Sequence, residues 1–287
     1  MRNLVLSMKW SWILIVILAC TSFVRAQKPA QDETQRTREM WDTNLLSKRP
    51  SGRKVIATKP SSKDDALVGI TVWRLRASHS GDDPVVRELV HEDNETRQFT
   101  PERISAKTAL HEGEKVRISI EAARPGYLYV VDQDVYADGT PGEEYLIFPT
   151  LRLHGGDNHV KAGAVVEIPS MDDSPPFFRL HRRRSDQTVE LLTIIVTPGL
   201  IQHITIGRER MKLSARQVED WEKQWTANVY RLEAVGLAGK SVTPAEKSAA
   251  TGDELLTQDD PVPQTLYHLD AKPGKPLLVQ LPLQISK

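Results

Sequence analysis

The chain has 287 residues, with 38 Lys or Arg balanced by 38 Asp or Glu, so its formal net charge is zero. This length can bury a sizeable core in one large domain or in two small ones. A chain without a strong positive field is a poor candidate for binding nucleic acid, so we expect no nucleic-acid partner.

Residues 1–26 have the three parts of a secretory signal peptide. Arg2 and Lys9 supply a positive start, an apolar run over residues 10–20 follows, and Val24-Arg25-Ala26 is typical of a cleavage site. Removing residues 1–26 takes away three basic side chains and no acid, which leaves 35 basic against 38 acidic side chains. We therefore expect an exported protein of the periplasm or the extracellular space.

Two other fates of this N-terminus are open. Ile17-Leu18-Ala19-Cys20 is similar to a lipoprotein processing site, and lipidation of Cys20 would tether the domain to a membrane leaflet. The apolar run could also act as a permanent anchor, although it is short for a transmembrane helix. We favour cleavage after Ala26, which leaves no transmembrane helix and no cysteine in the mature chain. A chain without cysteine has no disulfide and no thiolate metal ligand.

Residues 27–66 are polar and are interrupted by three prolines and a glycine, which predicts a flexible polar linker. Within this segment, residues 34–46 could form a short helix. Met40, Trp41 and Leu45 would then make a thin apolar stripe along one side of it.

Residues 67–200 have the pattern of an antiparallel β-sandwich. Two aromatic and β-branched runs, 126–132 and 145–149, enclose a polar segment and predict a β-hairpin with a long acidic loop. Residues 115–122 alternate apolar and polar side chains, as in a strand with one buried face. The nearly continuous apolar run 189–197 predicts a strand in the middle of the fold. The fold class is therefore mainly β.

Residues 201–287 are expected to add one helix and terminal strands to the same domain. Ser214 and Gln217 form a capping box, and an apolar stripe containing Trp221 and Trp225 predicts a helix over residues 214–235 that docks on a sheet. We expect a loop over residues 239–264. Two runs of apolar side chains then predict a last pair of strands, residues 266–269 and 277–285.

Several short motifs follow one another between residues 110 and 169. They are Leu110-x-x-Gly113-Glu114-Lys115-Val116-Arg117-Ile118, Gly126-Tyr127-Leu128-Tyr129-Val130, Leu146-Ile147-Phe148-Pro149, Asp157-Asn158-x-Val160-x-Ala162-Gly163 and Ile168-Pro169. In this order they resemble the bacterial family called domain of unknown function 4384, over about residues 67–198. The subgroup with a Trp-containing C-terminal helix is the most similar. The resemblance implies an extracytoplasmic β-rich module, often an accessory part of envelope or signalling proteins, and it implies no catalytic residue.

Two loops contain candidate metal ligands. Asp132, Asp134 and Asp138 in the hairpin loop place oxygen ligands close together, which is similar to a calcium loop, although the spacing differs from that of an EF-hand. Turn and capping roles are the alternative interpretation of these acids. His154 and His159 lie five residues apart in a second loop and could bind a divalent metal. A metal-dependent enzyme that uses both loops is the alternative function.

Candidate binding residues form a basic cluster and an aromatic pair. Arg182, Arg183 and Arg184 could attract an acidic group, or they could simply lie in a solvated loop. Tyr127 and Tyr129 share one face of a strand, where aromatic side chains serve packing or binding. We expect no catalytic residue and no cofactor. The predicted function is a non-catalytic binding or scaffolding role in the cell envelope, with a protein or a glycan as the partner.

Overall fold

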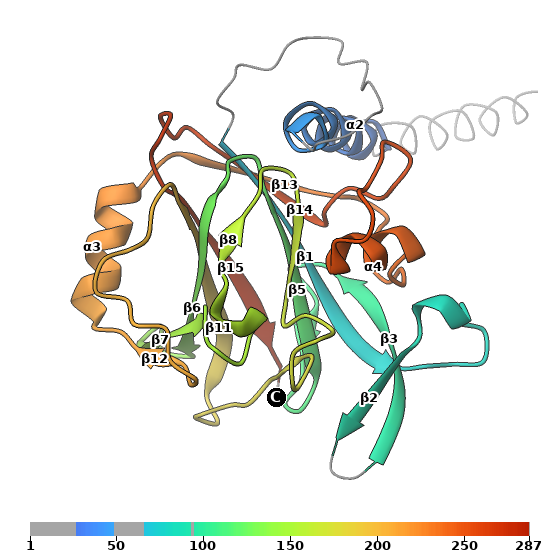
Figure 1. Cartoon of the computed structure of the whole chain (residues 1–287), viewed down its shortest axis with the longest axis horizontal. Helices are drawn as coiled ribbons and strands as arrows, with labels where there is room; N and C mark the ends of the chain where they lie inside the picture. The colour runs from blue at the N-terminus through green and yellow to red at the C-terminus, as the bar shows by residue number, and fades with distance from the viewer. Residues whose placement is uncertain (1–26, 49–65, 93–94, 287) are drawn as a thin grey trace, which may run out of the picture.

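The computed structural model describes residues 27–48, 66–92 and 95–286. Two β-sheets pack face to face, and helices cover the outer face of each sheet (Figure 1). The mainly β sandwich predicted from the sequence is therefore confirmed. The predicted signal peptide and Cys20 lie outside the described residues. Within the described part of the chain, no helix is both long enough and apolar enough to span a membrane.

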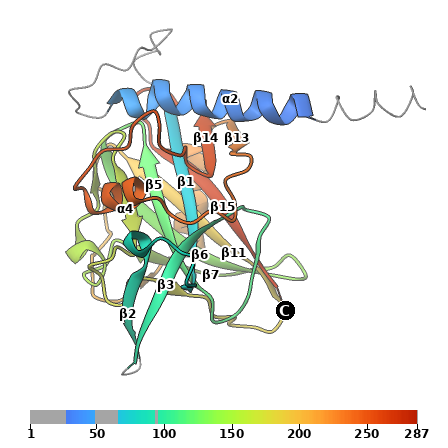
Figure 2. The ribbon, with the colours of Figure 1, turned by 90° about the vertical axis from the view of Figure 1, so that its right-hand side faces the viewer.

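The first sheet, called sheet A here, is organised around the long strand β1. Strand β1 pairs along one edge with β5, and along the other edge first with β14 and then with β3. Strands β2 and β3 extend away from the body of the molecule as an arm (Figure 2). The strands of sheet A are β1 (Ala66–Ala77), β2 (Glu88–Glu92), β3 (Glu95–Ile104), β5 (Lys115–Ala122), β9 (Val165–Ile168), β10 (Phe178–Arg179), β13 (Val229–Glu233) and β14 (Thr265–Leu269).

The second sheet, called sheet B here, has the strand order β12-β7-β6-β11-β15-β4, and β8 also pairs with β6. Strand β11 lies between β6 and β15, which confirms that the apolar run 189–197 is an inner strand. The strands are β4 (Ala109–Leu110), β6 (Gly126–Tyr136), β7 (Pro141–Phe148), β8 (His159–Val160), β11 (Gln187–Thr197), β12 (Met211–Lys212) and β15 (Leu277–Ile285).

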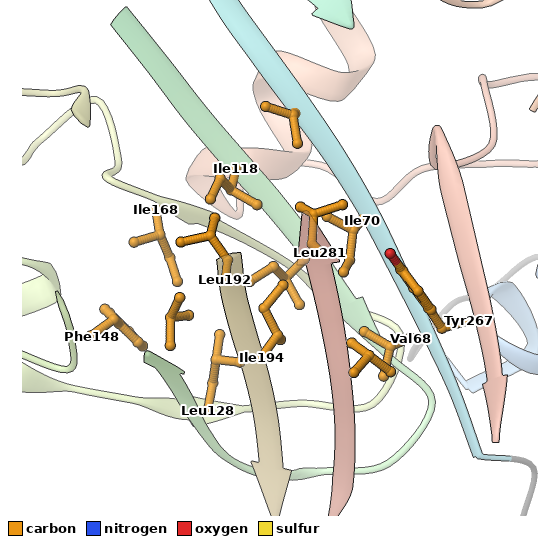
Figure 3. Close-up of a cluster of buried hydrophobic side chains, with 14 of the residues drawn as sticks. Val68, Ile70, Ile118, Leu128, Phe148, Ile168, Leu192, Ile194, Tyr267 and Leu281 are labelled. Carbon is orange, nitrogen blue, oxygen red and sulfur yellow. The ribbon is translucent and has the colours of Figure 1, made fainter. Parts of the chain in front are cut away.

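The core lies between the two sheets and is built by alternation along the strands. Side chains two residues apart in a strand point to the same face, so each inner strand contributes a row of apolar side chains. Figure 3 shows these rows gathered between the ribbons. Their burial is the main favourable contribution to folding. Members that are at most 2% exposed include Val68, Ile70, Ile118, Leu128, Phe148, Ile168, Leu192, Ile194 and Leu281.

Helices form the two outer layers. Helices α2 (Gln27–Asn44) and α4 (Pro244–Thr251) pack on the outer face of sheet A, where Trp41 and Ala249 share an apolar cluster with Leu67 and Leu266. Helix α3 (Ala215–Trp225) packs on the outer face of sheet B. Short 3-10 turns lie at η1 (Leu46–Lys48), η2 (Pro84–Val86) and η3 (His154–Gly156).

The predicted hairpin is present, but its loop is much shorter than expected. Strand β6 continues to Tyr136 and β7 begins at Pro141, so only residues 137–140 form the loop. Asp132 and Asp134 are therefore strand residues, and the prediction that placed them in a loop was wrong. Strand β6 pairs with β7 on one side and with β11 on the other, and this pairing outweighs the low strand preference of Asp.

The C-terminal region differs from the prediction in where its elements end. Ser214 caps α3 as expected, and its Oγ accepts a hydrogen bond from the Gln217 backbone N–H at 3.2 Å. The helix ends at Trp225, however, and residues 229–233 pair with β14 as an edge strand. The prediction of a continuous helix to Val235 was wrong, because backbone pairing with β14 outweighs the helical spacing of the apolar residues.

Two further expectations for this region were wrong. The predicted loop 239–264 contains α4, which begins with a capping box between Thr243 and Glu246. The last two strands do not pair with each other, because β14 joins sheet A and β15 joins sheet B. The chain between these strands therefore crosses from one sheet to the other.

The N-terminal segment also differs from the predicted linker, since residues 27–44 form α2. The thin apolar stripe packs on the outer face of sheet A, where Trp41 and Leu45 are completely buried and Met40 is partly buried. Trp41 Nε1 donates a hydrogen bond to Glu121 Oε2 at 3.0 Å. Residues 49–65 of the predicted linker lie outside the described residues. Helix α2 is thus packed against the same domain as sheet A.

We expect Trp41→Ala to lower the free energy of unfolding by about 3–5 kcal/mol, because the substitution empties a completely buried site. Urea unfolding followed by circular dichroism measures this change. Glu39→Ala, on the exposed side of the same helix, is the matched control and should change stability by less than about 0.5 kcal/mol. Equal small effects of both substitutions would mean that α2 does not dock.

Candidate functional site

The inner face of sheet B changes from apolar to acidic toward one end. Along β6, the buried row Leu128 and Val130 continues as Asp132 and Asp134, which are 4% and 2% exposed. Glu190 of β11 lies directly opposite Asp134 in the register. Because side chains two apart share a face, the three carboxylates extend the core rows instead of facing solvent. The sandwich therefore has a polar end between its two sheets.

A cavity of about 510 Å³ opens at this polar end. Its lining includes the three carboxylates, called the acidic floor here (Asp132, Asp134 and Glu190), of which Asp132 and Asp134 are buried and Glu190 is partly buried. Its apolar walls come from both sheets and include Val116, Ile118, Ile147, Leu192 and Leu283. The volume lies within the range of small-molecule binding sites, and the mixture of apolar walls with a few polar groups is typical of them.

Arg183 is the cation that holds the acidic floor in place. Its Nη2 donates a hydrogen bond to Asp132 Oδ2 at 3.0 Å, and its Nη1 lies 3.0 Å from Asp134 Oδ2. The guanidinium carbon also lies 4.8 Å from the ring centroid of Tyr145. One guanidinium thus faces three carboxyl groups, so the floor carries more acid than this arginine balances.

Burial raises the pKa of all three carboxyl groups in the floor. Burial and the negative charge of Asp132 raise the pKa of Glu190 well above its ordinary value. Asp132 Oδ1 is buried and accepts no hydrogen bond from an N–H group of the described residues, and the Asp132 carboxyl shares a hydrogen bond with the carboxyl of Glu190. The floor can thus accept a further donor.

Arginines form the exposed rim of the cavity. Arg152 and Arg179 are already paired, with Glu209 at 3.3 Å and with Glu92 respectively. Arg208 makes no hydrogen bond or ion pair with any described residue. Arg210 stacks on the ring of Tyr145 at 4.1 Å, and its charge lowers the pKa of Asp134. Arg208 and Arg210 are called the rim arginines here. They leave two guanidinium groups available to an anion.

Comparison with known protein families identifies part of the chain. Residues 109–189 match the family described as "Domain of unknown function (DUF4384)". The chain carries a DUF4384 domain. The resemblance expected over residues 67–198 is confirmed for this shorter segment. No curated protein and no solved structure matches the chain.

The DUF4384 segment contains most of the acidic floor and its cation. It runs from β4 into β11 and includes Asp132, Asp134 and Arg183. Glu190 follows the last matched residue directly, while the rim arginines lie further along the chain. The cavity is therefore completed by residues outside the DUF4384 match.

The predicted basic cluster does not act as one surface. Only Arg183 lines the cavity. Arg182 Nε lies 3.4 Å from Glu112, and Arg184 Nη2 lies 2.6 Å from Asp186, both at the exposed surface. The three neighbouring arginines thus divide among three sets of acidic partners.

The candidate metal ligands are not brought together. Asp138 is exposed in the hairpin turn, where its Oδ1 accepts a hydrogen bond from the Thr140 backbone N–H at 2.9 Å. Neither His154 nor His159 lines the cavity: His154 Nε2 lies 2.7 Å from the Glu167 carbonyl oxygen, and His159 contacts the edge of Tyr127. In residues 27–48, 66–92 and 95–286, no group of three His, Cys, Asp or Glu is placed to hold a metal ion.

The predicted aromatic pair lies on the opposite face of β6 from the cavity. Tyr129 is 1% exposed, and its hydroxyl accepts a hydrogen bond from the Ile201 backbone N–H at 3.0 Å. Tyr127 is partly buried against the same apolar cluster under α3. Both rings therefore serve packing of the outer layer.

The sequence interpretation missed three residues of the cavity. Glu190 carried a readable signal, because it is the only charged residue inside the apolar run 189–197. The rim arginines carried none, since they lie in a polar segment before β12 and reach the cavity only through the fold.

We expect Arg183→Met to destabilise the fold by about 3–5 kcal/mol, because it leaves two buried carboxylates without their cation. Arg184→Met removes only an exposed ion pair and should change stability by about 1 kcal/mol or less. Urea unfolding at pH 7 compares the two variants. Similar losses for both would contradict the special role of Arg183.

Proposed function

We propose that this chain is an exported, non-catalytic binding module of the bacterial envelope, which takes a small ligand in the cavity between its sheets. The ligand is either a free molecule or a single residue or sugar unit of an envelope protein or glycan. The observation that carries the proposal is the 510 Å³ cavity with a largely buried acidic floor and two rim arginines that form no close ion pair with a described residue.

The acidic floor has no evident role in packing. Positions 132, 134 and 190 continue apolar rows, and apolar side chains there would extend the core without any cost of burying charge. Replacing buried ion pairs by apolar residues is often neutral or stabilising. A folded chain that keeps three acids and an arginine in this place is therefore better explained by binding than by stability.

The cavity is also held in shape before any ligand arrives. Two floor carboxylates sit on β6, and the third sits on the neighbouring strand β11. Arg183 fixes two of them, and Tyr145 lies against both Arg183 and Arg210. A site built on strands and locked by such contacts loses little conformational freedom on binding.

The cellular setting rests on the N-terminal sequence. Residues 1–26 have the charge, the apolar run and the small cleavage-site residues of a secretory signal. The family resemblance likewise implies an extracytoplasmic accessory module. Lipidation at Cys20 would place the same binding module at a membrane surface, and mass spectrometry of the mature N-terminus distinguishes the two outcomes.

The test is capture of a ligand by the purified protein from a low-molecular-mass digest of bacterial envelopes, read by native mass spectrometry. We expect Ile147→Trp to abolish capture, because Ile147 lines the cavity and the larger ring would fill it. Leu151→Trp is the matched control, since Leu151 is 56% exposed and does not line the cavity. Capture that persists in a folded Ile147→Trp protein would rule out the cavity as the binding site.

A further inference from the structure

The lining of the cavity combines an acidic floor with exposed arginines, so it offers partners to groups of both charges. We propose that it binds a zwitterionic ligand, with an ammonium group against Asp132 and Glu190 and a carboxylate group at Arg208 and Arg210. This inference rests on the proposed function, because it names the class of ligand that the same cavity takes.

The floor has the geometry of a site for a compact cation. Arg183 approaches Asp132 through Oδ2, which leaves the buried Oδ1 of Asp132 without an N–H donor from the described residues, and the Asp132 carboxyl shares a hydrogen bond with Glu190. Glu190 lies across from Asp134 on the same face. An ammonium group has three donors and no acceptor, so it can serve several carboxylate oxygens at once. Charge-assisted hydrogen bonds of this kind are the strong ones in a buried site.

Protonation of Glu190 supports the same assignment. Burial and the charge of Asp132 raise its pKa well above the ordinary value for a glutamic acid. In the empty cavity, burial therefore favours the protonated form of Glu190, which reduces the negative charge of the floor. A bound ammonium group would lower the pKa of Glu190 and displace this proton. Binding is therefore expected to release protons to the solvent.

The rim supplies the complementary half. Arg208 has no ion pair with a described residue, and Arg210 is held against Tyr145, where its charge lowers the pKa of Asp134 without forming a close ion pair. A guanidinium group matches a carboxylate with two parallel hydrogen bonds. The other two lining arginines at the rim, Arg152 and Arg179, are already paired with Glu209 and Glu92. The rim arginines are thus the ones that a ligand carboxylate can use.

Both charges are needed for good binding. The acids of the floor would repel a simple anion, and the rim arginines would repel a simple cation. The lining also includes the apolar side chains of Ile147, Leu192 and Leu283, which suit a hydrocarbon spacer. A ligand with an ammonium group and a carboxylate on an aliphatic chain satisfies all three parts.

The test uses three matched probes: 6-aminohexanoate, hexanoate, which lacks the ammonium group, and hexylamine, which lacks the carboxylate. Isothermal titration calorimetry of the full chain is run at pH 7 in two buffers of different ionisation enthalpy. We expect 6-aminohexanoate to bind at least about tenfold more tightly than either control, which corresponds to about 1.4 kcal/mol. We also expect its binding to release protons.

Substitutions test which residues bind the ammonium group and which bind the carboxylate. Glu190→Gln should weaken the binding of 6-aminohexanoate and remove the proton release. It should leave the binding of hexanoate unchanged or make it stronger. The double variant with Arg208→Ala and Arg210→Ala should weaken the binding of 6-aminohexanoate and of hexanoate but not the binding of hexylamine. Arg184→Ala, outside the cavity, should change none of these affinities.

Two results would overturn the inference. One is hexanoate or hexylamine binding as tightly as 6-aminohexanoate, and the other is no detectable binding of any probe. If Ile147→Trp still abolishes capture of an envelope ligand in either case, the binding function stands and only the ligand class is wrong. If capture also fails in the unmodified protein, the proposed function itself is wrong.

Discussion

Arg183 reaches from the segment before β11 to Asp132 and Asp134 on the neighbouring strand β6, about fifty residues earlier in the chain. The rest of the polar end depends on these ion pairs. Two carboxylates on an inner sheet face are costly to bury unless a cation and hydrogen bonds accompany them. Arg183 supplies both, and it also joins the loop before β11 to the strand that forms the floor. Without it, the inner rows of sheet B could not remain acidic where they reach the cavity.

The remaining structure explains why the cavity lies at this end of the sandwich. The apolar rows of the two sheets close tightly along most of their length, with core side chains at most a few per cent exposed. Helices seal the outer faces, so each sheet has one face committed to a helix and one to the core. The inner face at the end of the rows is therefore where polar side chains can converge on one enclosed space. Arg208 and Arg210 complete that space from the segment between β11 and β12.

The sequence predicted individual strands from their local patterns, but it did not predict which strands pair with each other. Alternation over residues 115–122 and the apolar run 189–197 predicted β5 and the inner strand β11 correctly, because burial of one or both faces leaves a local signature. Asp132 and Asp134 were assigned to a loop because Asp is a turn former, and the pairing of β6 with two neighbours that keeps them in a strand is long-range. The early end of α3 at Trp225 has the same origin, since the edge of β14 draws residues 229–233 into a strand.

The same limit applies to the site. Three adjacent arginines looked like one basic surface, yet each has a different acidic partner, and only Arg183 lines the cavity. Glu190 was visible as a single acid in an apolar run, but its meaning came only from its position opposite Asp134. The DUF4384 motifs likewise identify the scaffold of residues 109–189 and stop just before Glu190. The ligand cavity is thus a property of the assembled sheets.

The central claim is that the acidic floor is desolvated and short of one cation when the cavity is empty. A carboxyl carbon-13 NMR titration of the full chain, with Glu190 assigned by comparison with Glu190→Gln, tests it most directly. The account predicts that Glu190 titrates well above the ordinary glutamic acid value of 4.5 in the free protein. It also predicts that saturating 6-aminohexanoate lowers this pKa. An ordinary pKa for Glu190 in the free protein, unchanged by the probe, would contradict the account.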